Sequence, residues 1–301
     1  MGWRSLKARV PWDHISAAVP SQHRGDTNMT KTHTVRPQTP RITAPRRSLN
    51  IGYQRVLVLF VVIGIWWLIA ATALLPETLV PDPIAVIVEL GRLSITAEFW
   101  QAIIATLSGA MLGLAASIVV GIPLGVVSGR FWRVERSVNF LVDFGRAFPA
   151  VALVGVLVLM LGRGIEMKSV LVFIAVMFPL IIQTQHGVQQ VNPMIQETCH
   201  AFRIPQGLYI RKVLLPAAMP SIMTGLRLAA SVAVLVAISA EVLTNAPGIG
   251  QKIAEAQIGS NAPKAFAFIV ASGVLGYLVN YAVSAAQNRI IGWRPAQGGD
   301  E

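Results

Sequence analysis

The sequence has few charged residues and almost no cysteine. Of its 301 residues, only 13% are Asp, Glu, Lys or Arg, which is about half the share found in an ordinary soluble domain. Cys199 is the single cysteine, so an intrachain disulfide framework and every CxxC motif are excluded. Acidic residues are the scarcer charge, with 14 against 25 basic residues and a net charge of +11. These shortages argue against an ordinary soluble enzyme.

Sequence signatures of catalysis are also missing. The chain contains no HExxH, no G-x-S-x-G and no phosphate-binding G-x-x-x-x-G-K-[ST]. The segment Gly250-Gln-Lys252 lacks both the upstream glycine and the following Ser or Thr of the last motif. We therefore predict no catalytic residue, no metal site and no cofactor bound by this chain.

Long apolar stretches without charge dominate the rest of the sequence. Segments 56–76, 99–129, 169–196 and 265–288 contain no Asp, Glu, Lys or Arg, and each reaches the ~20 residues that a membrane-spanning helix needs. The fold class predicted is an all-α polytopic membrane bundle of six transmembrane helices. The predicted spans are 56–75, 102–128, 147–162, 169–187, 228–240 and 265–287.

The two ends of the chain differ from this middle. Residues 1–50 are rich in Pro, Thr, Ser and Arg and have no apolar period, so we expect a disordered basic tail, with translation starting at Met1 or Met29. Residues 51–295 form the expected membrane domain, with a cytoplasmic loop at about 188–222. Residues 296–301 form a short C-terminal tail.

The distribution of Lys and Arg predicts the orientation. With the N-terminus inside, the inner segments hold eighteen of them and the outer loops hold five. By the positive-inside rule, both termini are cytoplasmic. Ten of the basic residues precede Val56, where they flank the first span, so the net charge does not require a nucleic-acid partner.

Small residues recur every four positions along the second span. Gly109, Gly113, Gly121 and Gly125 fall on one ridge of the predicted helix. Such a ridge lets another helix approach closely. The sequence leaves open whether that helix belongs to the same subunit or to another one.

A short helix is predicted within the loop between the fourth and fifth spans. Asn192 can cap it, Pro193 suits its first position and Pro205 ends it, which bounds the helix at 193–204. Ile195, Cys199 and Phe202 form an apolar stripe along it. Either the helix packs back on its own bundle or a partner covers this stripe.

At these residues the chain resembles the membrane subunits of binding-protein-dependent ABC importers. That family carries a loop motif of the form E-A-A-x3-G-x9-I-x-L-P. Here Glu197-Thr198-Cys199, then Arg203, then the segment ending in Leu215-Pro216 fall at the same spacings. Two alanines and the glycine of the motif are replaced, and Pro205 is positioned to supply the break that the glycine would give. Further features resemble the branch for nitrate, alkylsulfonates or taurine: 80–83 (Val-Pro-Asp-Pro), 146–149 (Arg-Ala-Phe-Pro), 225–227 (Gly-Leu-Arg), 248–250 (Gly-Ile-Gly) and 293–294 (Trp-Arg).

The resemblance implies a type I importer permease in the inner membrane of a prokaryote. It implies that the loop helix docks on a cytoplasmic ATPase, which binds ATP and Mg²⁺, and that an extracytoplasmic binding protein delivers the solute. Six spans make half of a typical pore, so we expect a second permease copy, as a homodimer, or a pair with a sister permease. The implied coupling residues are Glu197, Thr198, Cys199, Phe202, Arg203, Leu215 and Pro216.

Charged residues next to the two shortest spans are the candidates for a solute path. Arg146 precedes 147–162, while Arg227 and Glu241 flank 228–240. Such weak spans usually face protein or water, and an inward-facing arginine would attract a small anion. The alternative is that Arg227 extends to the cytoplasmic lipid phosphates and Glu241 reaches the outer water. A secondary transporter is the alternative, although it would normally show internal repeats or several buried carboxylates. A membrane-embedded enzyme is a third reading, without a supporting motif.

Overall fold

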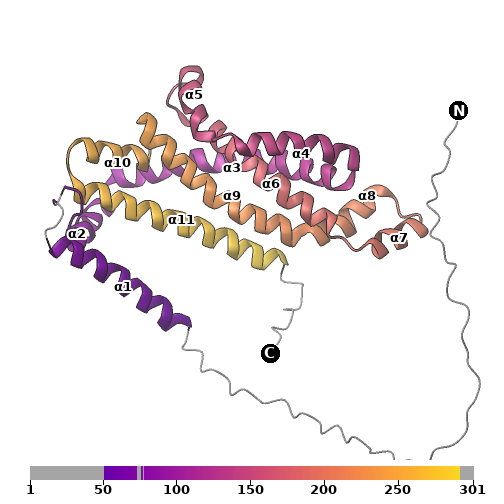
Figure 1. Ribbon diagram of the computed structural model, residues 1–301, viewed down its shortest axis with the longest axis horizontal. Coiled ribbons are helices and arrows are strands. Elements are labelled where there is room, and N and C mark those ends of the chain that lie inside the picture. The colour runs from indigo at the N-terminus through magenta and orange to yellow at the C-terminus, as the bar shows by residue number, and fades with distance from the viewer. Residues whose placement is uncertain (1–50, 73–75, 77, 292–301) are drawn as a thin grey trace, which may run out of the picture. The chain divides into compact units, whose positions relative to one another are not determined.

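The computed structural model describes residues 51–72, 76 and 78–291, and every regular element in these ranges is a helix. Both predicted tails, 1–50 and 296–301, lie outside the described residues. The elements are α1 (Ile51–Ala71), α2 (Pro83–Ser94), α3 (Ala97–Arg130), α4 (Trp132–Ala147), the 3-10 turn η1 (Ala150–Leu153), α5 (Val154–Leu161), α6 (Ile165–Gln189), α7 (Pro193–Ala201), α8 (Gln206–Tyr209), the π turn η2 (Ile210–Leu214), α9 (Leu215–Thr244), α10 (Ile249–Ile258) and α11 (Ala262–Ile291) (Figure 1).

Within the described residues, four helical stretches are long and apolar enough to cross a membrane. Three of them contain the predicted spans 102–128, 169–187 and 265–287, within α3, α6 and α11. The fourth contains α9. Helix α1 is a shorter apolar helix, with residues 73–75 of the predicted first span outside the described residues. The chain is an all-α membrane bundle, but the six full spans expected from the sequence are not all present as single long helices.

The third predicted span, 147–162, is not one helix. Helix α4 and the η1–α5 segment form an apolar pair bent by 76°. The break lies at Phe148 and Pro149, where Phe148 is extended (φ −82°, ψ 124°) because a proline follows it. If this pair counts as one span, the part of the chain that the structure describes has five spans.

The fifth predicted span, 228–240, is too short. Helix α9 is 30 residues long and runs from Leu215 to Thr244, so Arg227 lies inside it. Arg227 does not end the helix because its side chain finds a partner on the protein: Nε donates to Oδ1 of Asn280 on α11 over 3.0 Å. Lys168 was likewise excluded from the fourth span, yet it lies in the first turn of α6.

Helix α6 packs between α3 and α9. The glycine ridge of α3 faces α6 of the same chain: a Cβ on Gly113 would lie 2.5 Å from the Ser169 carbonyl oxygen, and one on Gly125 would lie 2.5 Å from Thr184 Cβ. The pairing advances in the same direction along both helices, so α3 and α6 are parallel. The chain between them must therefore return to the starting end, and the bent α4–α5 pair makes that return (Figure 1).

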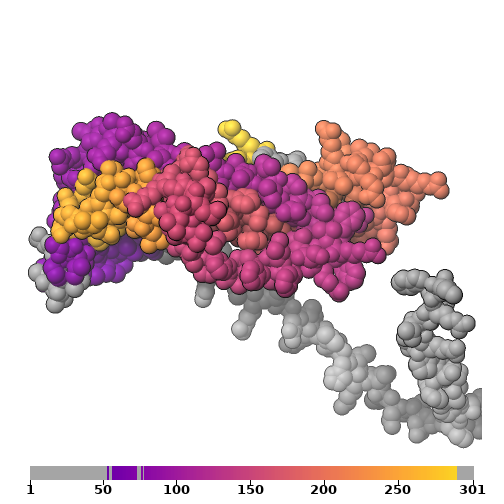
Figure 2. All heavy atoms as spheres, turned by 90° about the horizontal axis from the view of Figure 1, so that it is seen from above, coloured from indigo at the N-terminus to yellow at the C-terminus, as the bar shows by residue number. Residues whose placement is uncertain are grey.

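The two ends of the bundle carry different small helices. Helices α7 and α8 lie at one end, while α2 and α10 lie at the other (Figures 1 and 2). Each end has its own buried group. A small apolar cluster around Val188, Leu214 and Ile222 supports α7, and the large core of α3, α6, α9 and α11 extends to α10.

Candidate functional site

The predicted loop helix is present as α7, with the predicted start. The Asn192 side chain accepts a hydrogen bond from the Met194 N–H over 2.9 Å, and Pro193 occupies the first helical position. The helix ends at Ala201 instead of Ile204. It ends earlier than expected because backbone hydrogen bonds close a turn after Ala201, so the helix has already ended before Pro205 would interrupt it.

Arg203 makes that turn. Its φ is +53°, in the left-handed region that a glycine would occupy without strain. The Ile204 N–H donates to the Cys199 carbonyl and the Arg203 N–H donates to the His200 carbonyl, each over 3.0 Å. This is the Schellman pattern of helix ends, and Cys199 and Ile204, at the two positions of its usual apolar contact, both pack against the apolar cluster below. The chain thus keeps the turn of the loop motif although Arg203 replaces the glycine.

Replacing Arg203 with glycine is therefore expected to stabilise the end of α7. The left-handed conformation costs a side-chain-bearing residue about 1–2 kcal/mol, of which glycine's extra chain entropy offsets about 0.5–1 kcal/mol. Backbone amides of α7 should exchange hydrogen about threefold more slowly in the variant. The control is Ala201→Gly, a helical position where glycine should speed exchange. Equal effects of the two substitutions would contradict the strain argument.

Helix α7 presents an apolar surface to solvent. Phe202 is 78% exposed and Met194 is 72% exposed, with Ile195 also exposed. Glu197 and Thr198 lie on the exposed side, whereas Cys199 is half-buried against the cluster below. Leu215 and Pro216, the end of the motif, form the first turn of α9. The structure therefore brings Cys199 and Leu215 to the base of the loop and leaves Glu197 and Phe202 on its surface.

A groove runs along α9 and α11. It has a volume of about 600 Å³ and is mostly apolar, with three serines, Ser231, Ser239 and Ser272, on its wall. Arg227 lies one turn before Ser231, whose hydroxyl donates to the Arg227 carbonyl over 3.3 Å. Its guanidinium is exposed, as is that of Arg146 at the end of α4. Neither Arg227 nor Arg146 is among the residues that line the groove, although Arg227 lies one turn from Ser231 on the same helix.

Glu241 has a different environment from the two arginines. It is fully buried, and its Oε1 accepts a hydrogen bond from Lys168 Nζ over 2.8 Å. The pair lies at the α10 end of the bundle, and Lys168 is only 2% exposed. The sequence reasoning named Glu241 but missed Lys168, because it placed that lysine in an outer loop. A charge inside a membrane helix normally has a buried partner, which was the available signal.

Every polar group of this pair is hydrogen bonded. Lys168 Nζ also donates to the carbonyls of Ala105 over 2.8 Å and Pro247 over 2.7 Å, which uses all three of its protons. Glu241 Oε2 accepts from Thr106 Oγ1 over 2.8 Å and from the Gly250 N–H over 3.0 Å. The network joins α3, α6, α9 and the start of α10, so it holds four elements at one point.

Gly248 allows the backbone to run close to the Glu241 carboxylate of this network. Its φ is +153°, and a Cβ there would collide with the Glu241 carboxylate. Within segment 248–250, named above for its resemblance to the nitrate, alkylsulfonate or taurine branch, the first glycine is thus explained by close backbone approach to a buried charge. Among the described residues, no group of three His, Cys, Asp or Glu side chains is placed to hold a metal ion.

Comparison with known proteins identifies the family of this chain. Residues 117–292 match the family described as "Binding-protein-dependent transport system inner membrane component". The putative aliphatic sulfonates transport permease protein of Bacillus subtilis is 27% identical over 79% of this chain and 87% of its own length. The formylaminopyrimidine transport permease protein of Halalkalibacterium halodurans is 30% identical over 79% of this chain and 95% of its own length.

A solved structure has the same fold. In an inward-facing structure of the MetNI methionine ABC transporter, the matched chain has a TM-score of 0.59 and 19% identity, covering 65% of this chain and 98% of that one. The likeness at this identity concerns the fold alone. The family match over more than half of the sequence, with relatives that are transport permease proteins, establishes that the chain belongs to the inner-membrane components of binding-protein-dependent transport systems, as a permease subunit of an ABC importer.

Proposed function

We propose that this permease forms the path for a small anionic solute and is driven by an ATPase that docks on α7. The observation that carries the proposal is the exposed surface of α7, where Phe202, Met194 and Glu197 face solvent on a helix held rigidly at both ends. A helix outside the bundle gains nothing from exposed apolar side chains unless a partner covers them. ATP and Mg²⁺ belong on that partner.

The α7 end is the cytoplasmic end in this proposal. Six basic residues lie at this end of the bundle. Three of them follow α7 and three surround the junction of α3 and α4: Arg203, Arg211, Lys212, Arg130, Arg133 and Arg136. An excess of Lys and Arg marks the cytoplasmic side. Both termini are then cytoplasmic, and α2 and α10 face the compartment of the solute-binding protein.

Charge reversal at Glu197 tests the docking. In the proteoliposome-reconstituted importer, Glu197→Arg should reduce solute-stimulated ATP hydrolysis at least tenfold, because a charge of the wrong sign is placed in an interface. Phe202→Ala should reduce it by removing an exposed apolar anchor. Solute-stimulated ATPase activity is the measurement, together with co-purification of the ATPase.

The matched control for this test is Glu166→Arg. Glu166 is also exposed, but it lies in the first turn of α6, at the end of the bundle opposite α7. It should insert normally and keep co-purification of the ATPase at the wild-type level. Wild-type stimulation in Glu197→Arg and Phe202→Ala would refute docking on α7.

The groove between α9 and α11 is the proposed solute path. Its wall combines apolar side chains with serine hydroxyls, and the exposed guanidinium of Arg227 lies one turn beyond it. A guanidinium can bind a sulfonate, a nitrate or a carboxylate through paired hydrogen bonds. The sulfonate named for the relative from Bacillus subtilis fits this chemistry. We leave Glu241 out of the path because its carboxylate is buried with Lys168.

Replacing Arg227 with glutamine should raise the KM of uptake about tenfold, the loss expected for one charge-assisted contact. Basal ATPase activity should stay unchanged, since Arg227 is distant from α7 along α9. Arg146→Gln should have a smaller effect, and the double variant should be the most impaired. The control is Arg163→Gln, which removes an exposed arginine between α5 and α6. Uptake kinetics at wild-type values in both single variants and the double variant would exclude these arginines.

A second copy of the chain completes the path in this proposal. The groove is open along one side, and α5 carries Leu159 at 88% and Met160 at 74% exposure. A homodimer would place two such surfaces around one axis. Cross-linking of single cysteines placed on α5, in a Cys199→Ser background, reports whether two copies meet there.

A further inference from the structure

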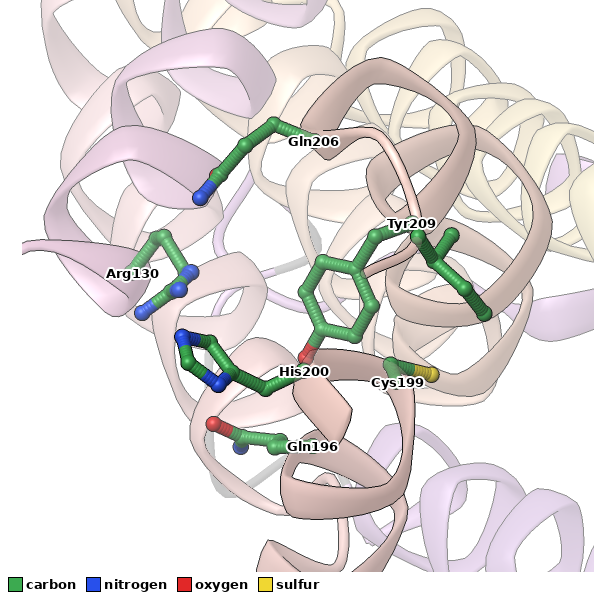
Figure 3. Close-up of a pocket in the computed structure, with 7 residues that line it drawn as sticks. Arg130, Gln196, Cys199, His200, Gln206 and Tyr209 are labelled. Atoms are coloured by element: carbon green, nitrogen blue, oxygen red, sulfur yellow. The ribbon is translucent and has the colours of Figure 1, made fainter. Parts of the chain in front are cut away.

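A small cavity lies where the end of α3 meets α7 and α8 (Figure 3). Its volume is about 60 Å³, which is room for about four waters. Seven residues line it: Arg130, Gln196, Cys199, His200, Ile204, Gln206 and Tyr209. It is separate from the exposed surface of α7 formed by Phe202 and Met194, and from the groove between α9 and α11.

Several hydrogen-bond donors point into this cavity, and no negatively charged acceptor lines it. Figure 3 shows the Arg130 guanidinium, the His200 ring and the Gln206 amide directed into the same space, with the Tyr209 hydroxyl directed toward α7. No Asp or Glu is present among the seven lining residues. Among the described residues, Arg130 forms no ion pair with a carboxylate. The electrostatic character of the cavity is therefore positive.

Two of these donors are buried and have no partner. Tyr209 is 6% exposed, yet its hydroxyl makes no hydrogen bond within the described part of the chain, and the same holds for Nε of Arg130. The guanidinium is nevertheless held in place, with its carbon 5.9 Å from the centre of the Tyr209 ring and 5.8 Å from that of Phe131. A buried polar atom left unpaired costs about 1–3 kcal/mol. A ligand that accepts from both groups would remove that cost.

We propose that this cavity binds a tetrahedral oxyanion, as inorganic sulfate or phosphate or as the phosphate of a lipid headgroup. Arg130 supplies the charge, and Tyr209, His200 and Gln206 supply further donors, while the Gln196 amide already donates to the Val191 carbonyl over 3.2 Å. Because Arg130 ends α3 while His200 lies on α7, the anion bridges the two helices. Its occupancy therefore fixes α7 against the bundle. The site requires only these side chains, so anion binding can be tested independently of ATPase docking.

Equilibrium binding of radiolabelled sulfate to the full-length chain in neutral detergent tests the proposal, with chloride at equal ionic strength. Arg130→Gln should weaken binding at least tenfold, and Tyr209→Phe, which removes only the hydroxyl, should weaken it about threefold or more. Arg130→Lys keeps the charge and should retain weaker binding. The matched control is Arg133→Gln, an exposed arginine three residues further on, which should bind as wild type. Arg227→Gln, which tests the solute path, should also leave this binding unchanged.

Two further measurements decide the source of the anion and its effect. Sulfate should slow hydrogen exchange in α7 of the wild type but not of Arg130→Gln. If a lipid headgroup is the ligand, nanodiscs of phosphatidylglycerol should give α7 the same protection without added sulfate. If the free anion is the ligand, α7 should be protected only when sulfate is added, including in nanodiscs of phosphatidylcholine. No sulfate binding and no headgroup protection in the wild type would overturn the proposal. Equal losses in Arg130→Gln and Arg133→Gln would overturn it as well.

Discussion

Replacing Lys168 with methionine is expected to lower the free energy of unfolding by about 3–5 kcal/mol, because Glu241 would be left as a buried charge without its partner. The loss is large because the lysine also donates to the carbonyls of Ala105 and Pro247, and both bonds would be lost with it. Glu241→Gln should destabilise by a similar mechanism, leaving the ammonium of Lys168 unpaired. Thermal unfolding in detergent measures both, as a marked fall in Tm.

The double variant Lys168→Met with Glu241→Leu separates the ion pair from packing. Replacing both charges with apolar groups of similar volume is often close to neutral, so the double variant should recover much of the loss. Lys252→Met is the surface control. Lys252 pairs with Glu98 over 2.6 Å and with Glu255 over 2.9 Å near the surface, where such pairs contribute about 0–1 kcal/mol. Single variants at Lys168 and Glu241 with a wild-type Tm would contradict the assigned role.

Substituting Gly113 with alanine is expected to destabilise the bundle by about 1–3 kcal/mol, the usual cost of overpacking. The added Cβ would lie 2.5 Å from the Ser169 carbonyl oxygen and 2.6 Å from Val172 Cβ, so α3 and α6 must move apart. The Ser169 carbonyl oxygen belongs to the backbone of α6, so it cannot move aside as the end of a flexible side chain can. A lower Tm in detergent is the expected readout.

Gly91→Ala is the matched control for Gly113→Ala. Gly91 is a helical glycine in α2 with no atom within 4 Å of an added Cβ. Alanine there should be neutral or should stabilise by up to about 1 kcal/mol, since it favours the helix. If the two substitutions shifted Tm equally, the close contact of α3 with α6 would not be what requires the glycine ridge.

The sequence predicted helices well where apolar stretches are bounded by residues that truly end a helix. Asn192 and Pro193 were correctly assigned as the start of α7, because capping is a local interaction between neighbours in the chain. The same local reasoning found the glycine ridge on α3. Periodicity and caps depend on positions at most a few residues apart, so a single sequence contains them.

Charges were poor guides to where membrane helices end. The reasoning cut one span at Lys168 and another at Arg227, yet α6 and α9 continue through both residues. Each charge is accommodated by a partner far along the chain: Glu241 for Lys168 and Asn280 for Arg227. Those pairings depend on how helices are arranged, which periodicity does not report. The cavity at Tyr209 was missed for the same reason, since its donors come from three helices.

The network at Glu241 also sets the mechanics of α9. From Leu215 to Glu241 the helix is about 40 Å long at 1.5 Å per residue. It is anchored at the α10 end by bonds to three neighbouring elements, whereas its other end continues into the π turn η2, a looser helical geometry. If α9 pivots at this network, the end of the helix next to α7 moves furthest. A tilt of about 5° would displace the α7 end by about 3.5 Å while leaving the α10 end still.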